Sequence, residues 1–487
     1  MTYVPESWLE KTLRFFAASE LVEEALIISQ KIADIKIPKC RVLTGAILQS
    51  QKTISQIVNI TKTRYLLFLT GTRQFAIEPG ALEKLIETAE SRKAGMTYSD
   101  FYEEGEGGQG RVLHPLNDYQ LGSIRDDFNF GHVMIFSTEA VRTALEKYGE
   151  IPAVGYAGLY DLRLKISIDY PVYHFSEPLY SMGAQGKPSS DNQLFAYVDP
   201  RNTDEQKEME TVFTNYLKKI GAYIPQESLR MSRHVKESFP VEASVVIPVK
   251  NRCGTIRDAV ESALSQETDF SFNVIVVDNH STDGTTGILS ELSGEHPSLK
   301  HVVPMRTDLG IGGCWNEAVN SKFCGRYAVQ LDSDDLYSAP DVLWRIVDVL
   351  RDRKYAMVIG SYTIVNEKLE VIPPGLIDHR EWTDENGHNN ALRINGLGAP
   401  RAFDTNIIRK IGFPNVSYGE DYAAALRICR EYRIGRINES LYLCRRWQGN
   451  TDAALTIEEA NRNNAFKDSI RTQEVLARQV INKGANT

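Results

Sequence analysis

The stretch Tyr327-Ala328-Val329-Gln330-Leu331-Asp332-Ser333-Asp334-Asp335 joins a strand-like run to an acidic turn, and Pro340 marks the first turn of a predicted helix. Carboxylates this close repel one another when all are ionised, so a cation or a solvated turn must relieve the repulsion. Asp332 and Asp334 are two positions apart, and a turn can aim both at one divalent cation, which takes oxygen ligands. A polar turn that caps the next helix explains the same residues, so the triplet alone leaves both interpretations open.

Length and composition limit the class of protein. The 487 residues fit two or three domains, and the apolar share of 42% is enough for full cores. A net charge of -9 disfavours general binding to nucleic acid. No apolar run reaches the roughly 18–20 residues of a membrane span, and the first residues lack the pattern of a signal peptide. The six cysteines are scattered without a C-x-x-C pair, so we expect a soluble cytoplasmic protein.

The second half of the chain has the pattern of an open α/β sheet. From Ala243 onward, apolar runs typical of buried parallel strands alternate with helical segments. The predicted strands are Ser244–Val249, Phe272–Val277, Leu299–Val303 and Tyr327–Leu331. Such sheets bind ligands beyond the carboxyl ends of their strands. Polar residues follow the strands at these points, and we expect them to meet in one crevice: Pro248, Asn251, Asp278, Asp332 and Asp334.

Four motifs in this half resemble glycosyltransferase family 2. They are Ile247-Pro248-Val249-Lys250-Asn251, Val276-Val277-Asp278 continuing to Thr285, Leu331-Asp332-Ser333-Asp334-Asp335, and Gly419-Glu420-Asp421. The resemblance covers about residues 243–450. It implies the GT-A fold, a Rossmann-like α/β fold with a mixed sheet. It also implies a metal-dependent, inverting glycosyltransferase of the hexosyltransferase type, with a UDP-sugar as the expected donor.

The resemblance also implies roles on the donor side. Asp278 would hydrogen-bond the base of the nucleotide, with Pro248 and Asn251 lining the same pocket, although a helix-capping turn also explains Asp278. Asp332 would lie near the ribose and the metal, and Asp334 would ligate Mg²⁺ or Mn²⁺ at the donor pyrophosphate. A cation fixed there stabilises the charge that grows on the leaving nucleoside diphosphate.

On the acceptor side, Asp421 would be the general base, with Glu420 as the alternative. Both residues also suit the first turn of a helix, which favours acidic side chains. Trp447 stands at or near the position where relatives often carry His, so the identity of a third protein ligand stays open. Arg445 or Arg446 could pair with a phosphate or form a surface salt bridge.

The first half of the chain resembles the second. Arg64–Leu69 resembles Arg326–Leu331, and Val154–Tyr180 matches Val416–Tyr442 without a gap at the same offset (326 − 64 = 262). Matching blocks in one register predict a duplicated domain. Thr70, Gly71 and Thr72 face the second copy's Asp332, Ser333 and Asp334, and Gly158 and Leu159 face its Glu420 and Asp421. We therefore predict a degenerate first copy that serves as a scaffold, with a second active site of other residues as the alternative.

The expected organisation is a degenerate GT-A-like domain at 1–190, a helical linker at 191–240, a catalytic domain at 241–450 and a C-terminal helix at 451–487. The expected partners are a nucleotide-sugar donor and a glycan, lipid-linked or protein acceptor, with a possible homo-oligomer. Two other classes compete. A sugar nucleotidyltransferase needs a glycine-rich basic phosphate loop, and Val249–Thr255 contains one glycine. A non-catalytic sugar- or protein-binding scaffold would tolerate loss of the acidic residues.

Overall fold

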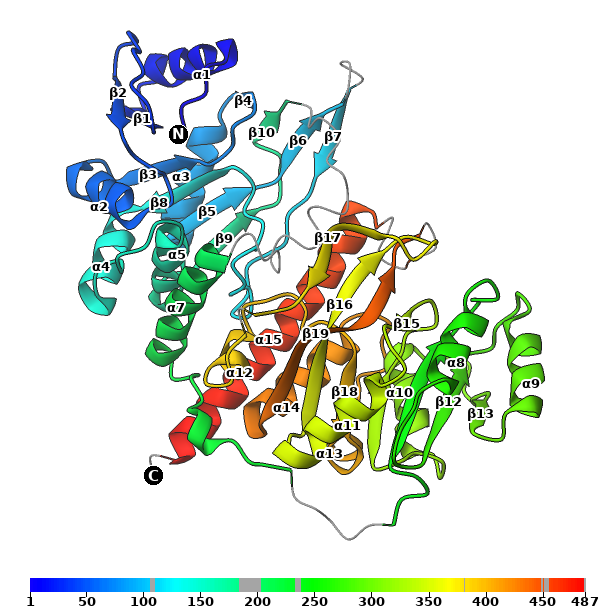
Figure 1. Ribbon diagram of the computed structural model, residues 1–487. Coiled ribbons are helices and arrows are strands. Elements are labelled where there is room, and N and C mark those ends of the chain that lie inside the picture. The colour runs from blue at the N-terminus through cyan, green and yellow to red at the C-terminus, as the bar shows by residue number, and fades with distance from the viewer. Residues whose placement is uncertain are drawn as a thin grey trace. The chain divides into compact units, whose positions relative to one another are not determined.

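The computed structural model describes residues 1–105, 110–183, 203–232, 238–380, 382–447, 450 and 455–485 (Figure 1). The chain divides into two compact units. The first comprises Met1–Ser189, Asp204–Ala222 and Leu455–Thr472, and the second comprises Ser190–Thr203, Tyr223–Ala454 and Gln473–Thr487. The helix predicted within the linker is α7, Thr203–Lys219, which groups with the first unit. Residues 191–202 and 233–237 of the predicted linker lie outside the described residues.

The second unit is built on one mixed sheet in the order β13-β12-β11-β14-β18-β16-β19-β15, with β17 paired to β16. Its strands are β11 Ala243–Val249, β12 Phe272–Asp278, β13 Leu299–Val302, β14 Tyr327–Gln330, β15 Leu336–Tyr337, β16 Met357–Val365, β17 Val371–Ile377, β18 Arg401–Asp404 and β19 Ile434–Arg445. The first four strands are parallel, whereas β18 runs antiparallel to β14 and β16. The predicted α/β fold with a mixed sheet is thereby confirmed.

The apolar runs form strands because both faces of this sheet are covered. Val245 and Val274 on one face and Val246 and Ile275 on the other are fully buried, as expected for central parallel strands. The helices of this unit are α8 Ile256–Leu264, α9 Thr285–Glu295, α10 Ile311–Asn320, α11 Val342–Arg353, α12 Gly387–Asn390, α13 Thr405–Ile411 and α14 Glu420–Glu431. The predicted C-terminal helix is α15, Ile457–Ala485. Among the helices of the described residues, none is long and apolar enough to span a membrane.

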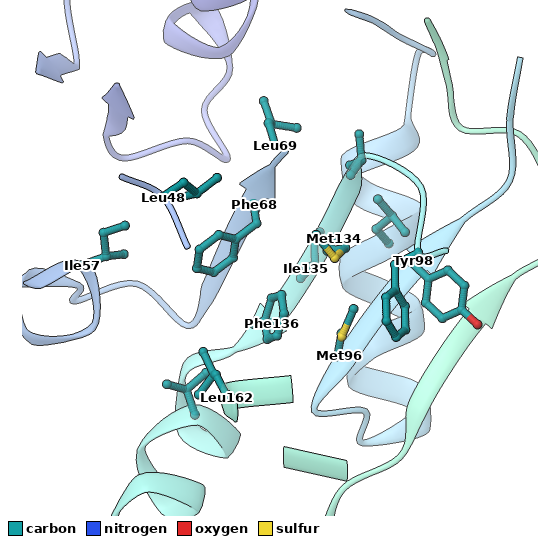
Figure 2. Packing of buried hydrophobic residues seen from close by; sticks show 14 of the residues in the cluster. Leu48, Ile57, Phe68, Leu69, Met96, Tyr98, Met134, Ile135, Phe136 and Leu162 are labelled. Atoms are coloured by element: carbon teal, nitrogen blue, oxygen red, sulfur yellow. The ribbon is translucent and has the colours of Figure 1, made fainter. Parts of the chain in front are cut away.

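The first unit contains three small sheets. The strands are β1 Ala25–Ser29 and β2 Cys40–Thr44; β3 Tyr65–Leu69, β8 Val133–Ser137, β5 Met96–Ser99 and β9 Val172–Phe175; and β4 Phe75–Ile77, β10 Tyr180–Met182, β6 Phe101–Glu104 and β7 Arg111–His114. The helices besides α7 are α1 Ser7–Ala18, α2 Gln51–Ile60, α3 Ala81–Arg92, α4 Thr138–Tyr148 and α5 Gly158–Asp169. Figure 2 shows its core, where Phe68 of β3 meets Phe136 of β8 edge to face at 5.1 Å between ring centroids.

The two units share a pattern of strand pairing. In the first unit, β8 pairs antiparallel with both β3 and β5, and β5 pairs parallel with β9. In the second unit, β18 pairs antiparallel with both β14 and β16, and β16 pairs parallel with β19. The register also matches: Phe136 lies opposite Leu66 and Met96, and Phe403 lies opposite Ala328 and Met357. Such matched pairings are what a duplicated domain predicts.

A close backbone approach at Gly312 fixes the segment that leads into α14. The Gly312 amide donates to the Val416 carbonyl at 3.0 Å. A Cβ at position 312 would lie 2.0 Å from the Pro414 carbonyl oxygen and 2.9 Å from Cβ of Glu420. Only glycine therefore lets α10 pack this tightly against the start of α14.

Replacing Gly312 by alanine is therefore expected to destabilise the protein by about 1–3 kcal/mol, because backbone must move to admit the methyl group. The matched control is Gly287→Ala inside α9, where an added Cβ meets nothing within 4 Å. Gly287→Ala should raise the free energy of unfolding by about 0.5–1 kcal/mol, because alanine favours the helix more than glycine does. Urea denaturation of the three proteins measures both effects, and equal midpoints for Gly312→Ala and wild type would contradict the packing described here.

Candidate active site

One cavity of about 460 Å³ lies at the carboxyl ends of β11 and β14 in the second unit. Residues from all four predicted motifs line it: Pro248, Lys250, Asn279, Asp332, Asp334, Glu420 and Asp421. Strand β14 carries the acidic turn, and the first turn of α14 carries the second acidic pair. The convergence expected at the carboxyl edge of the sheet therefore occurs for these residues.

Asp332 is held from two sides by hydrogen bonds. The Gln330 side chain donates from Nε2 to both carboxylate oxygens, at 2.9 Å and 3.0 Å. The Asp332 backbone amide donates to the Tyr442 hydroxyl at 2.9 Å. Burial raises the pKa of Asp332, while the charge of Arg401 and the Gln330 hydrogen bonds oppose that rise. The carboxylate is thus oriented by neutral donors and a nearby cation.

Asp334 accepts hydrogen bonds from two side chains that the sequence analysis did not connect with it. Its Oδ2 atom accepts from Trp447 Nε1 at 3.2 Å and from Asn450 Nδ2 at 3.4 Å. Arg252 Nε lies 3.7 Å from the same oxygen. An indole N–H can only donate, so Trp447 cannot serve as the third metal ligand that a histidine would provide. It orients Asp334 instead.

The donor set fits a hard divalent cation with few protein ligands. Asp332 and Asp334 offer carboxylate oxygens on the wall of one cavity. Within the ranges that the structure describes, no group of three or more His, Cys, Asp or Glu side chains could hold a metal ion. Mg²⁺ and similar ions are commonly bound by one or two carboxylates together with substrate phosphates. The residues present therefore suit a cation that a phosphate ligand completes.

The third acidic residue of the turn, Asp335, has a structural role. It is buried, and its Oδ1 atom accepts from the Arg445 amide at 2.7 Å. Burial and the charges of Asp334 and Asp332 raise its pKa well above the ordinary value. The Arg445 guanidinium donates to the Asp334 carbonyl and pairs with Asp258 at 2.8 Å. Of the two arginines considered for phosphate binding, Arg446 lines the cavity and Arg445 braces the turn.

The residues after β12 are placed differently from expectation. Asp278 is fully buried and is not among the cavity-lining residues; its oxygens accept from the Ser281 amide at 3.0 Å and the Thr286 hydroxyl at 2.5 Å. Asn251 accepts from the Thr282 amide at 2.8 Å and braces the same loop. Asn279 lines the cavity, and its buried Oδ1 atom has no hydrogen-bond partner. The contacts of Asp278 and Asn251 with a nucleotide stay a prediction.

The two acids that begin α14 have contrasting environments. Asp421 Oδ2 forms an ion pair with Arg401 Nη1 at 2.6 Å. Glu420 is 8% exposed, and its Oε2 atom has no hydrogen-bond partner. Burial, followed by the charge of Asp421, raises the pKa of Glu420 to about 8. Of the two acids, Asp421 thus has a cationic partner, whereas Glu420 has a raised pKa.

Arg401 is the functional residue that the sequence analysis missed. It begins β18, far in sequence from β14, and its backbone amide donates to Gln330 Oε1 at 3.1 Å. The antiparallel pairing of β18 with β14 brings Arg401 to the cavity, and no local sequence motif predicts that pairing. Gln330 and Asn279 were likewise unassigned, although Asn279 directly follows Asp278 and Gln330 lies two residues before Asp332.

Residues 244–410 match the family model of glycosyl transferase family 2. The second unit therefore carries a domain of this glycosyltransferase family, as the motifs indicated. A chondroitin synthase of Escherichia coli is 29% identical over 232 residues, which are 41% of this chain and 32% of that protein. A hyaluronan synthase of Pasteurella multocida is 32% identical over 132 residues, which are 27% of this chain and 13% of that protein. The chain thus spans about a third or less of the length of these relatives.

Two solved structures are similar to part of this chain. TarS of S. aureus, solved in complex with UDP-GlcNAc, gives a TM-score of 0.38 at 20% identity, covering 49% of this chain and 72% of the TarS chain. The mannosyltransferase PcManGT from Pyrobaculum calidifontis, solved in complex with GDP-Man and Mn²⁺, gives 0.35 at 17% identity, covering 60% and 88%.

The raised pKa of Glu420 predicts how stability depends on pH. The folded protein keeps the Glu420 proton up to about pH 8, whereas an unfolded glutamate loses it near pH 4.3. Stability therefore falls as pH rises through this window, because the unfolded state releases a proton that the folded state retains. Glu420→Gln removes that loss of stability, so it should unfold like wild type near pH 4.5 and be more stable at pH 8.5, by on the order of a few kcal/mol.

Urea denaturation at both pH values measures this difference. Glu317→Gln is the control, because Glu317 is an exposed glutamate on α10 and its substitution should give no pH-dependent difference. If Glu420→Gln differs from wild type in stability by the same amount at both pH values, the raised pKa of Glu420 is contradicted.

Proposed function

We propose that the chain is a metal-dependent, inverting glycosyltransferase of the hexosyltransferase type. It moves a sugar from a nucleotide-sugar, with UDP as the expected nucleotide, to an acceptor hydroxyl. One observation carries the proposal: Asp332 and Asp334 share a single cavity with Glu420 and Asp421. The match of residues 244–410 to glycosyl transferase family 2 supports the reaction class.

The nucleotide binds at the carboxyl ends of β11 and β12 in this proposal. Pro248 and Asn279 line that part of the cavity, and the unpaired Asn279 Oδ1 atom can accept a hydrogen bond from a base. Asp278 and Asn251 support the loop behind them. Lys250 and Arg446 line the same cavity and supply positive charge for a diphosphate.

Asp334 and Asp332 would hold Mg²⁺ or Mn²⁺. When bound, the cation stabilises the negative charge that forms on the departing nucleoside diphosphate. Gln330 and Trp447 keep the two carboxylates in place for this task. Since most of these donors are neutral, the carboxylates retain the negative charge that attracts the ion.

Asp421 takes the proton from the acceptor hydroxyl in the reaction. The acceptor oxygen forms a bond to the anomeric carbon of the sugar as the bond from that carbon to the diphosphate oxygen breaks. The bonding electron pair leaves with the nucleoside diphosphate. Because attack comes from the face opposite the leaving group, a single displacement inverts the configuration.

The first unit is, in our proposal, a non-catalytic copy of the same domain that acts as a scaffold. Its strands pair in the same pattern and register as those of the second unit. Thr70 and Thr72 occupy the positions of Asp332 and Asp334, and Gly158 occupies that of Glu420. A Cβ at Gly158 would lie 2.6 Å from the Gln49 carbonyl oxygen, so an acidic side chain has no room there.

The proposed partners are the nucleotide-sugar donor and a glycan, lipid-linked or protein acceptor, with a homo-oligomer as a further possibility. The proposed location is the cytoplasm. All six cysteines are unpaired, which agrees with a reducing compartment.

Calorimetric titration of UDP and of GDP, with and without Mn²⁺, tests the donor site. UDP should bind in a metal-dependent way, and Asp334→Asn should lose most of the metal-dependent part, at least tenfold in affinity, because a carboxylate ligand is replaced by a neutral amide. The control is Asp348→Asn, a surface aspartate on α11 that lies 3.5 Å from Arg351 and should leave binding unchanged.

If the protein prefers GDP, the proposed reaction stands and the expected donor becomes a GDP-sugar. Absence of nucleotide binding with metal present would contradict the proposed transferase. Equal binding by wild type and Asp334→Asn would instead contradict the metal assignment.

A further inference from the structure

Arg401 is the cation at the centre of a group of carboxylates. Its Nη1 atom lies 2.6 Å from Asp421 Oδ2. Burial disfavours its charge, but the carboxylates of Asp421, Asp332 and Glu420 outweigh burial and raise its pKa further. It therefore stays charged and influences residues on both the donor side and the acceptor side of the cavity.

The side chain of Arg401 is fixed by its surroundings. Nη1 also donates to the Gly398 carbonyl at 2.8 Å, and the backbone amide donates to Gln330 Oε1 at 3.1 Å. Strand β18 lies between β14 and β16, which prevents the residue from shifting along the sheet. The side chains of Arg401 and Asp421 are only 16% and 28% exposed, so their attraction is screened less than that of a surface pair.

Two adjacent acids then compete for one cation. The charged and titratable groups around them are Arg401 on β18, Asp332 after β14 and Tyr442 on β19, besides the acids themselves on α14. Arg401 pairs with Asp421, while Glu420 Oε2 has no partner. Neighbouring carboxyl groups titrate as a pair, and an external cation decides which of them keeps the charge.

We propose that Arg401 is a positioning residue for glycosyl transfer: its guanidinium keeps the Asp421 carboxylate ionised and oriented, so that Asp421 and not Glu420 takes the proton of the acceptor. This inference rests on the proposed function and settles the choice that the sequence left open between the two acids.

The proton follows a defined course. The acceptor O–H bond breaks, its proton binds Asp421, and the acceptor oxygen uses its electron pair to form the bond to the anomeric carbon. Asp421 is then neutral beside a cation that has lost its counter-charge. That imbalance favours release of the proton to water, which restores the ion pair for the next turnover.

The first test needs no substrate. Without Arg401, the pKa of folded Asp421 should rise, and stability should then fall more steeply between pH 5 and pH 8 in Arg401→Gln than in wild type. The double variant Arg401→Gln/Asp421→Asn also removes the carboxylate that pairs with Arg401 in the wild-type protein, and should return the slope toward the wild-type value. It should also be more stable than Arg401→Gln at pH 8, which keeps the test valid if the single variant folds poorly.

Arg345→Gln is the matched control, because Arg345 forms a surface pair with Glu439 at 3.4 Å and its loss should leave the slope unchanged. The inference would be overturned if the stability of Arg401→Gln depended on pH as steeply as that of wild type and no more. This readout is independent of the nucleotide titration, so a failure of the proposed function is distinguishable from a failure of the role of Arg401.

The second test uses catalysis. The rate kcat is measured as UDP released from the UDP-sugar that wild type uses, over a range of pH. In Arg401→Gln, the fall of kcat on the acid side should occur about one pH unit or more higher than in wild type, which is a tenfold lower proton concentration. Arg401→Lys keeps the charge and should recover most of the wild-type profile, although lysine lacks the planar fork. Loss of UDP binding with an unchanged pH profile would show that Arg401 contacts the donor phosphates and would overturn the positioning role.

Discussion

The second unit depends on stabilising five carboxyl groups around a single cavity. Like charges in a partly buried site repel strongly, and each group here is accommodated in a different way. Gln330 donates to Asp332, Trp447 and Asn450 donate to Asp334, and the Arg445 amide donates to Asp335. Asp421 pairs with Arg401, and burial raises the pKa of Glu420 to about 8. The segments that supply these groups, from β14 to the loop after β19, are therefore coupled through charge as well as through packing.

Much of the fold followed from local patterns in the sequence. The parallel strands β11, β12 and β14 were predictable because their apolar runs are continuous, which reflects burial on both faces. The acidic turn was predictable as part of a site because it follows a strand at the edge where such sheets bind ligands, whereas the acids that begin α14 were assigned from the family resemblance. The cavity brings both groups of acids together, and their chemical roles stay predictions.

The missed features depend on contacts between distant segments. Arg401 reaches the cavity only because β18 returns antiparallel beside β14, and a periodic pattern does not specify which strands pair. Asp278 was assigned to the pocket from its motif, yet its side chain turns into the loop that it caps while Asn279 lines the cavity. The position of Trp447 was noticed, but its hydrogen bond to Asp334 depends on the path of the chain after β19.

The close approach at Gly158 makes the proposed loss of catalysis in the first unit difficult to reverse. The Gly158 amide donates to the Gln49 carbonyl at 2.9 Å, and the helix α5 begins against that backbone. An acidic side chain at this position would require a shift of the main chain, and so a second change elsewhere in the chain. On the proposal that the first unit is a degenerate copy, a return to catalysis therefore needs at least two coordinated substitutions.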